Sequence, residues 1–359
     1  MLALRLTRGA RPLVQFRRLL VAAASAGTGF LLLYVLAGAL DGPTGSFPRL
    51  LWALVPLVLT VHFAVAVART DPATRPRTGM DAAGLGPVRL ALVAALSTAI
   101  ACTLGSALAL AVFLHLRGEV SGLPFDGAGA ALLHADQPLP VAAALTLLAL
   151  APLTASAAAA LALRPRARAP RTPQAELPWG ISLTACGLAV EAYAGRGSAG
   201  MLIGWALTAA GLSLAGPGLA YACGTLVQAV RPGALRLLAG RTLQEEAPRF
   251  GRPLGVLCAV AAAALSALAL RGSGGLHVPL GPLSAPAAAL VAVCAAGTLL
   301  VTAVEVRQTR AGVYESLRGL GGAAGILRGA VALRTAALLA VCVPLSWGVA
   351  QLTVLALSR

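Results

Sequence analysis

The 359 residues are 58% hydrophobic and only 11% charged, with a mean hydropathy of +0.84. A soluble domain has about a quarter of its residues charged, so this composition excludes an ordinary soluble globular protein. The apolar runs reach about 20 residues, the length of helix that crosses the roughly 30 Å hydrocarbon core of a bilayer. They are rich in alanine and leucine and do not alternate with period two, which excludes a β-barrel. The sequence therefore predicts an all-α, polytopic transmembrane helix bundle, a multi-pass protein of the plasma membrane.

Nine apolar segments are long enough to be interpreted as membrane-crossing helices. Two of them, 201–230 and 331–357, exceed the required length, so we expect them to tilt or to extend into the headgroup region. The segment 179–195 is short and contains Glu191. The nine expected spans are 19–40, 50–68, 90–116, 141–163, 179–195, 201–230, 254–270, 284–304 and 331–357.

Arginine is distributed unevenly among the loops. The formal net charge is +16, and all 28 basic residues are arginine. Of these, 23 lie in the N-terminal stretch and in every second loop, whereas five lie in the opposite loops and at the C-terminus. Arginine-rich loops stay on the cytoplasmic side, so we expect a cytoplasmic N-terminus and, after nine spans, an external C-terminus. Because the arginines lie in short loops between apolar runs, they indicate contact with the lipid bilayer rather than with nucleic acid.

Sequence motifs of enzymatic chemistry are missing. The chain has no G-x-x-x-x-G-K-[ST] phosphate-binding loop, nucleophile elbow or H-E-x-x-H zinc motif. Its cysteines form no C-x-x-C pair and lie in apolar runs, so we expect small packing residues rather than disulfides or a zinc site. We therefore expect a non-enzyme without catalytic residues, cofactor or metal, for which a partner must supply any ATP hydrolysis. The cysteines are Cys102, Cys186, Cys223, Cys258, Cys294 and Cys342.

Ionisable residues inside apolar runs are candidates for function. His62 is expected in the cytoplasmic third of the second span, either neutral and hydrogen-bonded between helices or as part of a proton relay. His115 is expected at the outer interface. Glu191 lies near the outer boundary with Arg196 five residues later, so we expect its carboxylate to snorkel to the headgroups. Arg334 is expected to mark the cytoplasmic start of the last span.

Two of the arginine-rich loops resemble each other. Residues 77–86 and 310–321 both begin Arg-x-Gly-apolar, both contain Gly-Leu-Gly, and both lead into a basic residue and a long apolar helix. The distance from the arginine to Gly-Leu-Gly differs by two residues. Chance similarity in a chain rich in glycine, alanine and leucine is the alternative.

These two loops have the composition of a docking segment. A short cytoplasmic helix joined rigidly to two membrane helices can transmit the movement of a docked partner into the bundle. Glycines permit tight turns, Leu320 or Met80 could fill an apolar groove, and charged residues could contact its rim. A loop that only fixes membrane orientation is the alternative. The predicted coupling residues are Met80, Asp81, Gly84, Leu85, Gly86, Glu315, Leu317, Arg318, Gly319, Leu320 and Gly321.

Residues 317–322, Leu-Arg-Gly-Leu-Gly-Gly, fit a Leu-Arg-x-Leu-Gly pattern, and residues 80–86 fit it less well, with Asp81 where a basic residue is usual. On these stretches the chain resembles the permease subunits of ABC transporters in the FtsX-like (MacB-type) family. Residues 235–243 resemble the amphipathic lead-in to the second core of its duplicated members. The resemblance implies a coupling segment between the second and third helices of a four-helix core and a separate cytoplasmic ABC-type ATPase as partner. Assembly as a homo- or heterodimer is a further expectation.

The resemblance divides the chain into three parts. Residues 1–163 would form a first four-helix core, 164–230 a linker with two linking helices, and 231–359 a second core. Two features depart from the family pattern. The second core lacks its last helix and so looks truncated, and residues 41–49 leave no room for the large external domain that follows the first helix in the family.

These observations predict a permease-like subunit that couples a separate cytoplasmic ATPase to the movement or extraction of an apolar or amphipathic substrate. The alternative is a non-transporting membrane adaptor or regulator descended from such permeases, which the missing helix and external domain favour. A secondary transporter is disfavoured because polar midplane residues and broken helices are sparse.

Overall fold

The computed structural model is built from long helices, and no strand occurs in the residues that it describes. The described residues are 12–41, 46–71, 87–120, 122, 124–164, 173–194, 198–229, 233–272, 281–319 and 324–358. The long helices are α2 (Pro12–Asp41), α3 (Ser46–Thr70), α5 (Pro87–Arg117), α6 (Val141–Leu163), α7 (Leu177–Ala194), α8 (Ser198–Ala229), α9 (Ala234–Gly272), α10 (Ser284–Gly319) and α11 (Ala324–Ser358). Two 3₁₀ turns, η2 (Pro173–Glu176) and η3 (Gly281–Leu283), precede α7 and α10.

The all-α membrane bundle is confirmed, with one correction to the number of spans. A long helix occurs at each of the nine predicted segments, and eight of those in the described residues are long and apolar enough to cross a membrane. The exception is α7, which has only 18 residues and includes Pro178 and Glu191. Whether α7 crosses the bilayer, and on which side the N-terminus lies, stay predictions.

The chain divides into two compact units. The first contains residues 1–167 and 278–294, and the second contains residues 168–277 and 295–359. Helix α10 therefore contributes its first turns to one unit and its remainder to the other.

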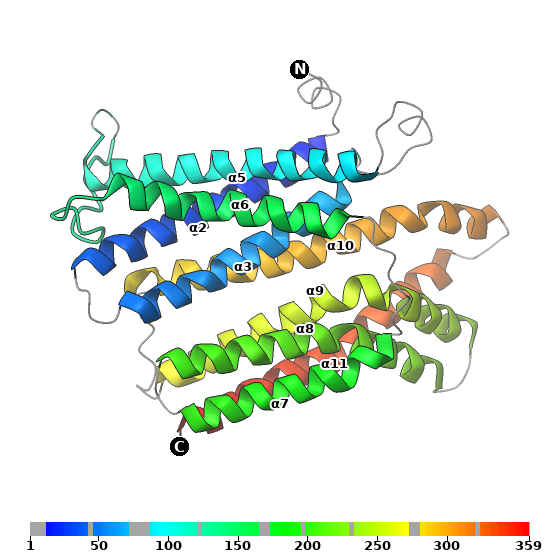
Figure 1. Ribbon diagram of the computed structural model, residues 1–359. Helices are drawn as coiled ribbons and strands as arrows, with labels where there is room; N and C mark the ends of the chain where they lie inside the picture. Colours follow the sequence, from blue (N-terminus) through cyan, green and yellow to red (C-terminus); the bar gives the residue numbers. More distant parts are fainter. Residues whose placement is uncertain are drawn as a thin grey trace. The chain divides into compact units, whose positions relative to one another are not determined.

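In the first unit, α2 packs against α3, α5 and α6, and α5 and α6 lie side by side (Figure 1). Its core contains Leu33, Phe113, Leu133 and Leu148, all of them buried. Buried hydroxyls also join its helices: Ser25 donates to the carbonyl oxygen of Cys102 at 2.9 Å. Such short hydroxyl contacts satisfy polar groups where lipid offers none.

A buried arginine at the end of α5 binds the backbone of the turns that follow this helix. The side chain of Arg117 is 1% exposed and donates to the backbone oxygens of Leu133, at 3.4 Å, and Gln137, at 2.5 Å. It also forms an ion pair with Glu119 at 2.8 Å. Apart from 121 and 123, which lie outside the described residues, residues 118–137 form turns and bends held to the end of the helix.

In the second unit, α8 lies between α7 and α9, with α11 also contacting all three (Figure 1). Glycines seven residues apart face one another across α7 and α8. A Cβ atom added to any of these four would be 2.5 Å or less from the opposite helix, so the two backbones are in contact. The four glycines are Gly180, Gly187, Gly204 and Gly211.

A row of large apolar side chains runs along the outside of α5. The side chains recur every fourth residue and are between 51% and 64% exposed, so they form a ridge inclined to the helix axis that winds over the lipid-covered side of the helix. They are Leu92, Leu96, Ile100, Leu104 and Leu108.

Candidate functional site

The predicted coupling residues lie at the edge of the described chain. Seven of them lie outside the described residues: Met80, Asp81, Gly84, Leu85, Gly86, Leu320 and Gly321. Four lie on the last turns of α10, where the backbone is described: Glu315, Leu317, Arg318 and Gly319. The second coupling segment is therefore largely the helical continuation of a membrane-crossing helix.

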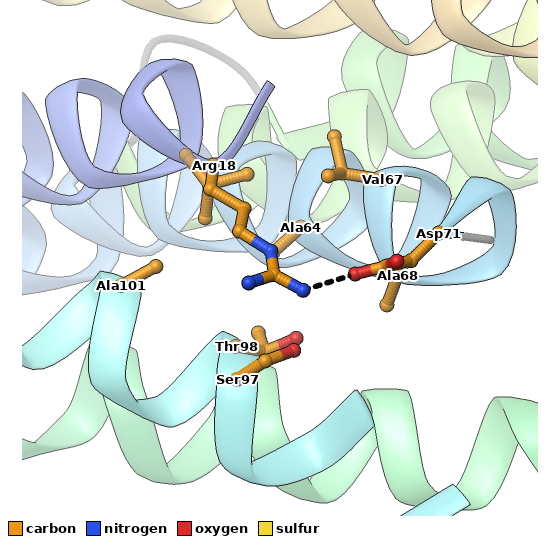
Figure 2. A pocket seen from close by; sticks show the side chains of 9 residues that line it. Arg18, Ala64, Val67, Ala68, Asp71, Ser97, Thr98 and Ala101 are labelled. Carbon is orange, nitrogen blue, oxygen red and sulfur yellow. Dashed lines mark hydrogen bonds and ion pairs between the residues drawn. The ribbon is translucent and has the colours of Figure 1, made fainter. Parts of the chain in front are cut away.

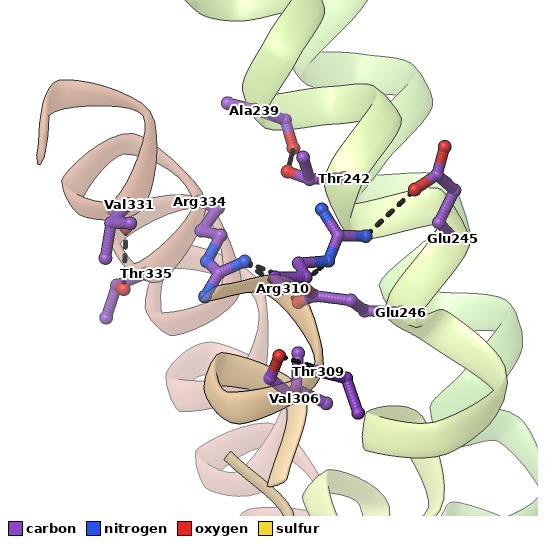
Figure 3. A network of polar contacts seen from close by, with 10 residues as sticks. All are labelled: Ala239, Thr242, Glu245, Glu246, Val306, Thr309, Arg310, Val331, Arg334 and Thr335. Carbon is purple, nitrogen blue, oxygen red and sulfur yellow. Dashed lines mark hydrogen bonds and ion pairs between the residues drawn. The ribbon is translucent and has the colours of Figure 1, made fainter. Parts of the chain in front are cut away.

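Arg310 anchors α10 where this segment begins. Its Nη2 donates to Glu245 Oε2 at 2.9 Å, and its Nε lies 2.9 Å from Glu246 Oε1 (Figure 3). Both carboxylates belong to α9. The Arg310 side chain is 19% exposed and that of Glu246 8%, so this ion pair is largely withdrawn from solvent and is screened less than the pair with Glu245, which is 70% exposed.

Glu246 also binds a second arginine. Nη1 of Arg334, on α11, donates to both carboxylate oxygens of Glu246 at 3.0 and 2.9 Å (Figure 3). The Glu246 side chain is only 8% exposed. One carboxylate on α9 thus holds α10 and α11, and Arg334 does more than mark the start of the last span.

Charge balance accounts for the burial of Glu246 between Arg310 and Arg334. Two carboxylates, Glu245 and Glu246, face two guanidinium groups, so the cluster is formally neutral. Burying a charge is costly unless it is paired and hydrogen-bonded, and Glu246 meets both conditions. A separate pair, Arg252 with Glu176 at 3.1 Å, ties α9 to η2.

Sequence reasoning gave Glu245 and Glu246 no role. Their partners lie 65 and 88 residues away, beyond any local pattern. The available signal was compositional: two adjacent acids in a chain with only 12 acidic residues, between Arg241 and Arg249 on a continuous helix.

An ion pair also stands before the first coupling segment. Arg18 Nη2, on α2, donates to Asp71 Oδ2 at 2.5 Å, and Asp71 is the last described residue before 72–86. Ser97 and Thr98 of α5 face this pair across a hollow of about 20 Å³ (Figure 2). Such a volume has room for about one water molecule, so the hollow suits hydration of the pair rather than an organic substrate.

An ion-paired residue thus precedes the first coupling segment by six positions and begins the second. Asp71 is bound to another helix of the first unit, and Arg310 to another helix of the second. No protein-family model, curated protein or solved structure matches the chain. The resemblance to FtsX-like permeases therefore stays a prediction from the sequence.

The structure corrects the position expected for Glu191. We expected this carboxylate to snorkel to the headgroups, but its side chain is 0% exposed and faces α8. Proximity to the end of a helix does not decide which way a side chain points. Here Gly204 of α8 leaves the space that Glu191 Cγ occupies.

The other singled-out residues differ in their surroundings. His115 lies two residues before the end of α5, and its ring nitrogens are 3.2 and 3.1 Å from the backbone oxygens of Val120 and Pro124. Nε2 of His62 is buried, with no hydrogen-bond partner in the part of the chain that the structure describes. Cys186 is exposed, contrary to the expectation that all six cysteines are buried packing residues.

Proposed function

We propose that the chain is a permease-like membrane subunit of an ABC transporter, coupling a separate cytoplasmic ATPase to the movement or extraction of an apolar or amphipathic substrate. One observation carries the proposal. The second of two similar arginine-rich segments begins at Arg310, which is ion-paired to a neighbouring helix of its own unit, and the first, 77–86, follows six positions after Asp71, which is likewise ion-paired within its unit.

The length of α10 supports the proposal that movement of the ATPase is transmitted into the membrane. Its 36 residues span about 54 Å at 1.5 Å per residue, well beyond the roughly 30 Å hydrocarbon core. The turns from Arg310 to Gly319 therefore extend the membrane helix by about 15 Å. A partner that pushes on these turns moves an unbroken helix.

The ion pairs would spread this movement to neighbouring helices. Glu246 connects α9 to both α10 and α11, so a displacement of the α10 end changes the positions of three helices together. Packed helices joined by ion pairs are one physical route by which movement at one site reaches another.

Co-purification tests the proposed partner. We expect an ABC-type ATPase to be recovered in stoichiometric amounts from native membranes in mild detergent, and Leu320→Arg to abolish its recovery. Leu132→Arg, the same change at an exposed leucine of the turns after α5, should leave recovery intact. Undiminished recovery with Leu320→Arg, while the variant stays folded, would refute the coupling assignment.

A non-transporting adaptor or regulator is the second candidate. The contact between α7 and α8 favours it, because these backbones touch at four glycines and leave no space for a substrate between them. ATP-dependent substrate movement by the reconstituted pair in liposomes would exclude the adaptor. Recovery of a stable partner without such movement would favour it.

A further inference from the structure

The carboxyl group of Glu191 is enclosed by helices of the second unit. Its side chain is 0% exposed, Thr208 of α8 donates to Oε1 at 3.3 Å, and Oε2 has no hydrogen-bond partner among the residues that the structure describes. The hydroxyl of Thr353, on α11, faces the same carboxyl and is itself 4% exposed. The second oxygen is thus a buried polar atom without a hydrogen bond of ordinary length, and such an atom calls for a physical explanation.

Within the described residues, no counter-charge approaches this carboxyl. Glu191 is the only charged residue of α7, and α8 has none. The charged residues of α11 are Arg328 and Arg334, and Arg334 lies 19 positions, or about 28 Å, before Thr353. Tyr193, the nearest titratable neighbour on α7, is 93% exposed and directed outward.

An ionised carboxylate in these surroundings would be strongly disfavoured. Moving a charge into an apolar region without a partner costs so much free energy that the group takes up a proton instead. A protonated carboxyl is neutral, and its O–H supplies a donor where the ionised form has only acceptors. The two facing hydroxyls suit this form, because each can both donate and accept.

We infer that Glu191 is a reversible proton-binding site, occupied while α7 is packed on α8 and α11 and emptied when α7 separates from them. The packing favours a proton over a metal cation. Gly204 abuts the Glu191 side chain, and Gly187 and Gly204 bring the two backbones into contact, so the ligand must need almost no volume. The inference holds whether or not the chain binds an ATPase.

The position of Glu191 provides a route for the proton. The residue lies three positions before the end of α7, about 5 Å along the helix axis. Fraying or outward movement of the last turn would bring the carboxyl to water without unfolding the unit, and would expel it from the apolar contact once it is ionised.

Infrared spectroscopy of the purified, lipid-reconstituted chain tests the inference. We expect the carbonyl-stretch absorption of a protonated carboxylic acid at neutral pH, lost in Glu191→Gln and retained in Glu176→Gln, whose carboxylate pairs with Arg252. The absorption should shift in heavy water, because the proton exchanges. An absorption spectrum that is the same in wild type and Glu191→Gln, or one that never shifts in heavy water, would overturn the proposal.

A second variant keeps the test decisive if Glu191→Gln does not fold. Thr208→Val keeps the shape of the side chain but removes the donor to Oε1, so the carbonyl stretch should move to higher frequency. Thr225→Val is the matched control, because Thr225 lies on the same helix and its hydroxyl donates to the backbone oxygen of Ala222 in that helix. Equal frequencies in both variants would show that the absorbing group is not Glu191.

Discussion

Glu246 and Glu245 are adjacent in sequence but differ in their surroundings. Glu246 is 8% exposed and shared by two arginines, whereas Glu245 is 70% exposed and, within the described residues, pairs with Arg310 alone. Exposed pairs contribute little because water screens them, while removing one member of a buried pair leaves an uncompensated charge.

Substituting these two glutamates should therefore have unequal effects. Glu246→Ala removes the carboxylate that pairs with Arg334 and leaves Arg310 paired with Glu245 only. We expect the free energy of unfolding to fall by about 3 kcal/mol. Glu245→Ala should cost at most about 1 kcal/mol. Denaturant titration in detergent micelles measures both, and equal losses would contradict the assignment of Glu246 as the shared partner.

Replacing Arg117 should loosen only the turns that its side chain contacts. Arg117→Ala removes the donors to Leu133 and Gln137, so the turns of 118–137 should become accessible to limited proteolysis while the rest of the chain stays protected. Arg328→Ala, at an exposed arginine of α11, is the control and should leave the cleavage pattern unchanged. Cleavage spread over the whole chain would mean that Arg117 stabilises the entire unit instead.

The residues also differ in how far sequence could predict them. The start of the second coupling segment at Arg310 was visible in the repeat, but its partner Glu246 was not, because folding brings them together over more than 60 residues. Glu191 was correctly placed near a helix end and wrongly placed in the headgroups, because the space beside it depends on a glycine of another helix.

At the scale of helices, the glycine contacts between α7 and α8 determine how closely the two backbones approach. A Cβ at Gly187 would lie 2.5 Å from the backbone nitrogen of Thr208, where neither helix can yield without moving. Gly348 of α11 has no atom within 4 Å of a Cβ added there.

Alanine at these two positions should have opposite effects. Gly187→Ala should destabilise the second unit by roughly 1–3 kcal/mol through overpacking. Gly348→Ala should stabilise it by about 0.5–1 kcal/mol, since alanine is the better helix former. Thermal unfolding of both variants in the same lipid checks the signs, and destabilisation at both positions would argue against specific contact at Gly187.

Helix positions were predictable from the sequence, and two helix lengths were not. Apolar runs located all nine helices, because a membrane span must be a continuous hydrophobic helix. Helix α9 begins about 20 residues before the predicted span 254–270. Helix α10 continues 15 residues beyond the predicted span 284–304. Those parts are rich in charged helix formers and are stabilised by ion pairs rather than by lipid.

At the scale of the whole chain, the predicted orientation in the membrane depends on the distribution of arginine. Whether the N- and C-termini lie on opposite sides of the membrane depends on whether α7 crosses it. Alkaline phosphatase folds only outside the cytoplasm, where its disulfides form. We expect low activity when it is fused after Arg171 and high activity when it is fused after Arg196. Equal activities would show that α7 does not cross the bilayer.

The outer row of apolar side chains on α5 has a consequence for the thickness of the surrounding membrane. Exposed valines extend the row to Val88 and Val112, so the lipid-covered face is about 36 Å long at 1.5 Å per residue. A bilayer core of roughly 30 Å matches that length only if the helix tilts by about 34°, beyond the common tilt of about 20°. Hydrophobic mismatch should thus make the protein more stable in bilayers of long-chain lipids than in those of short-chain lipids.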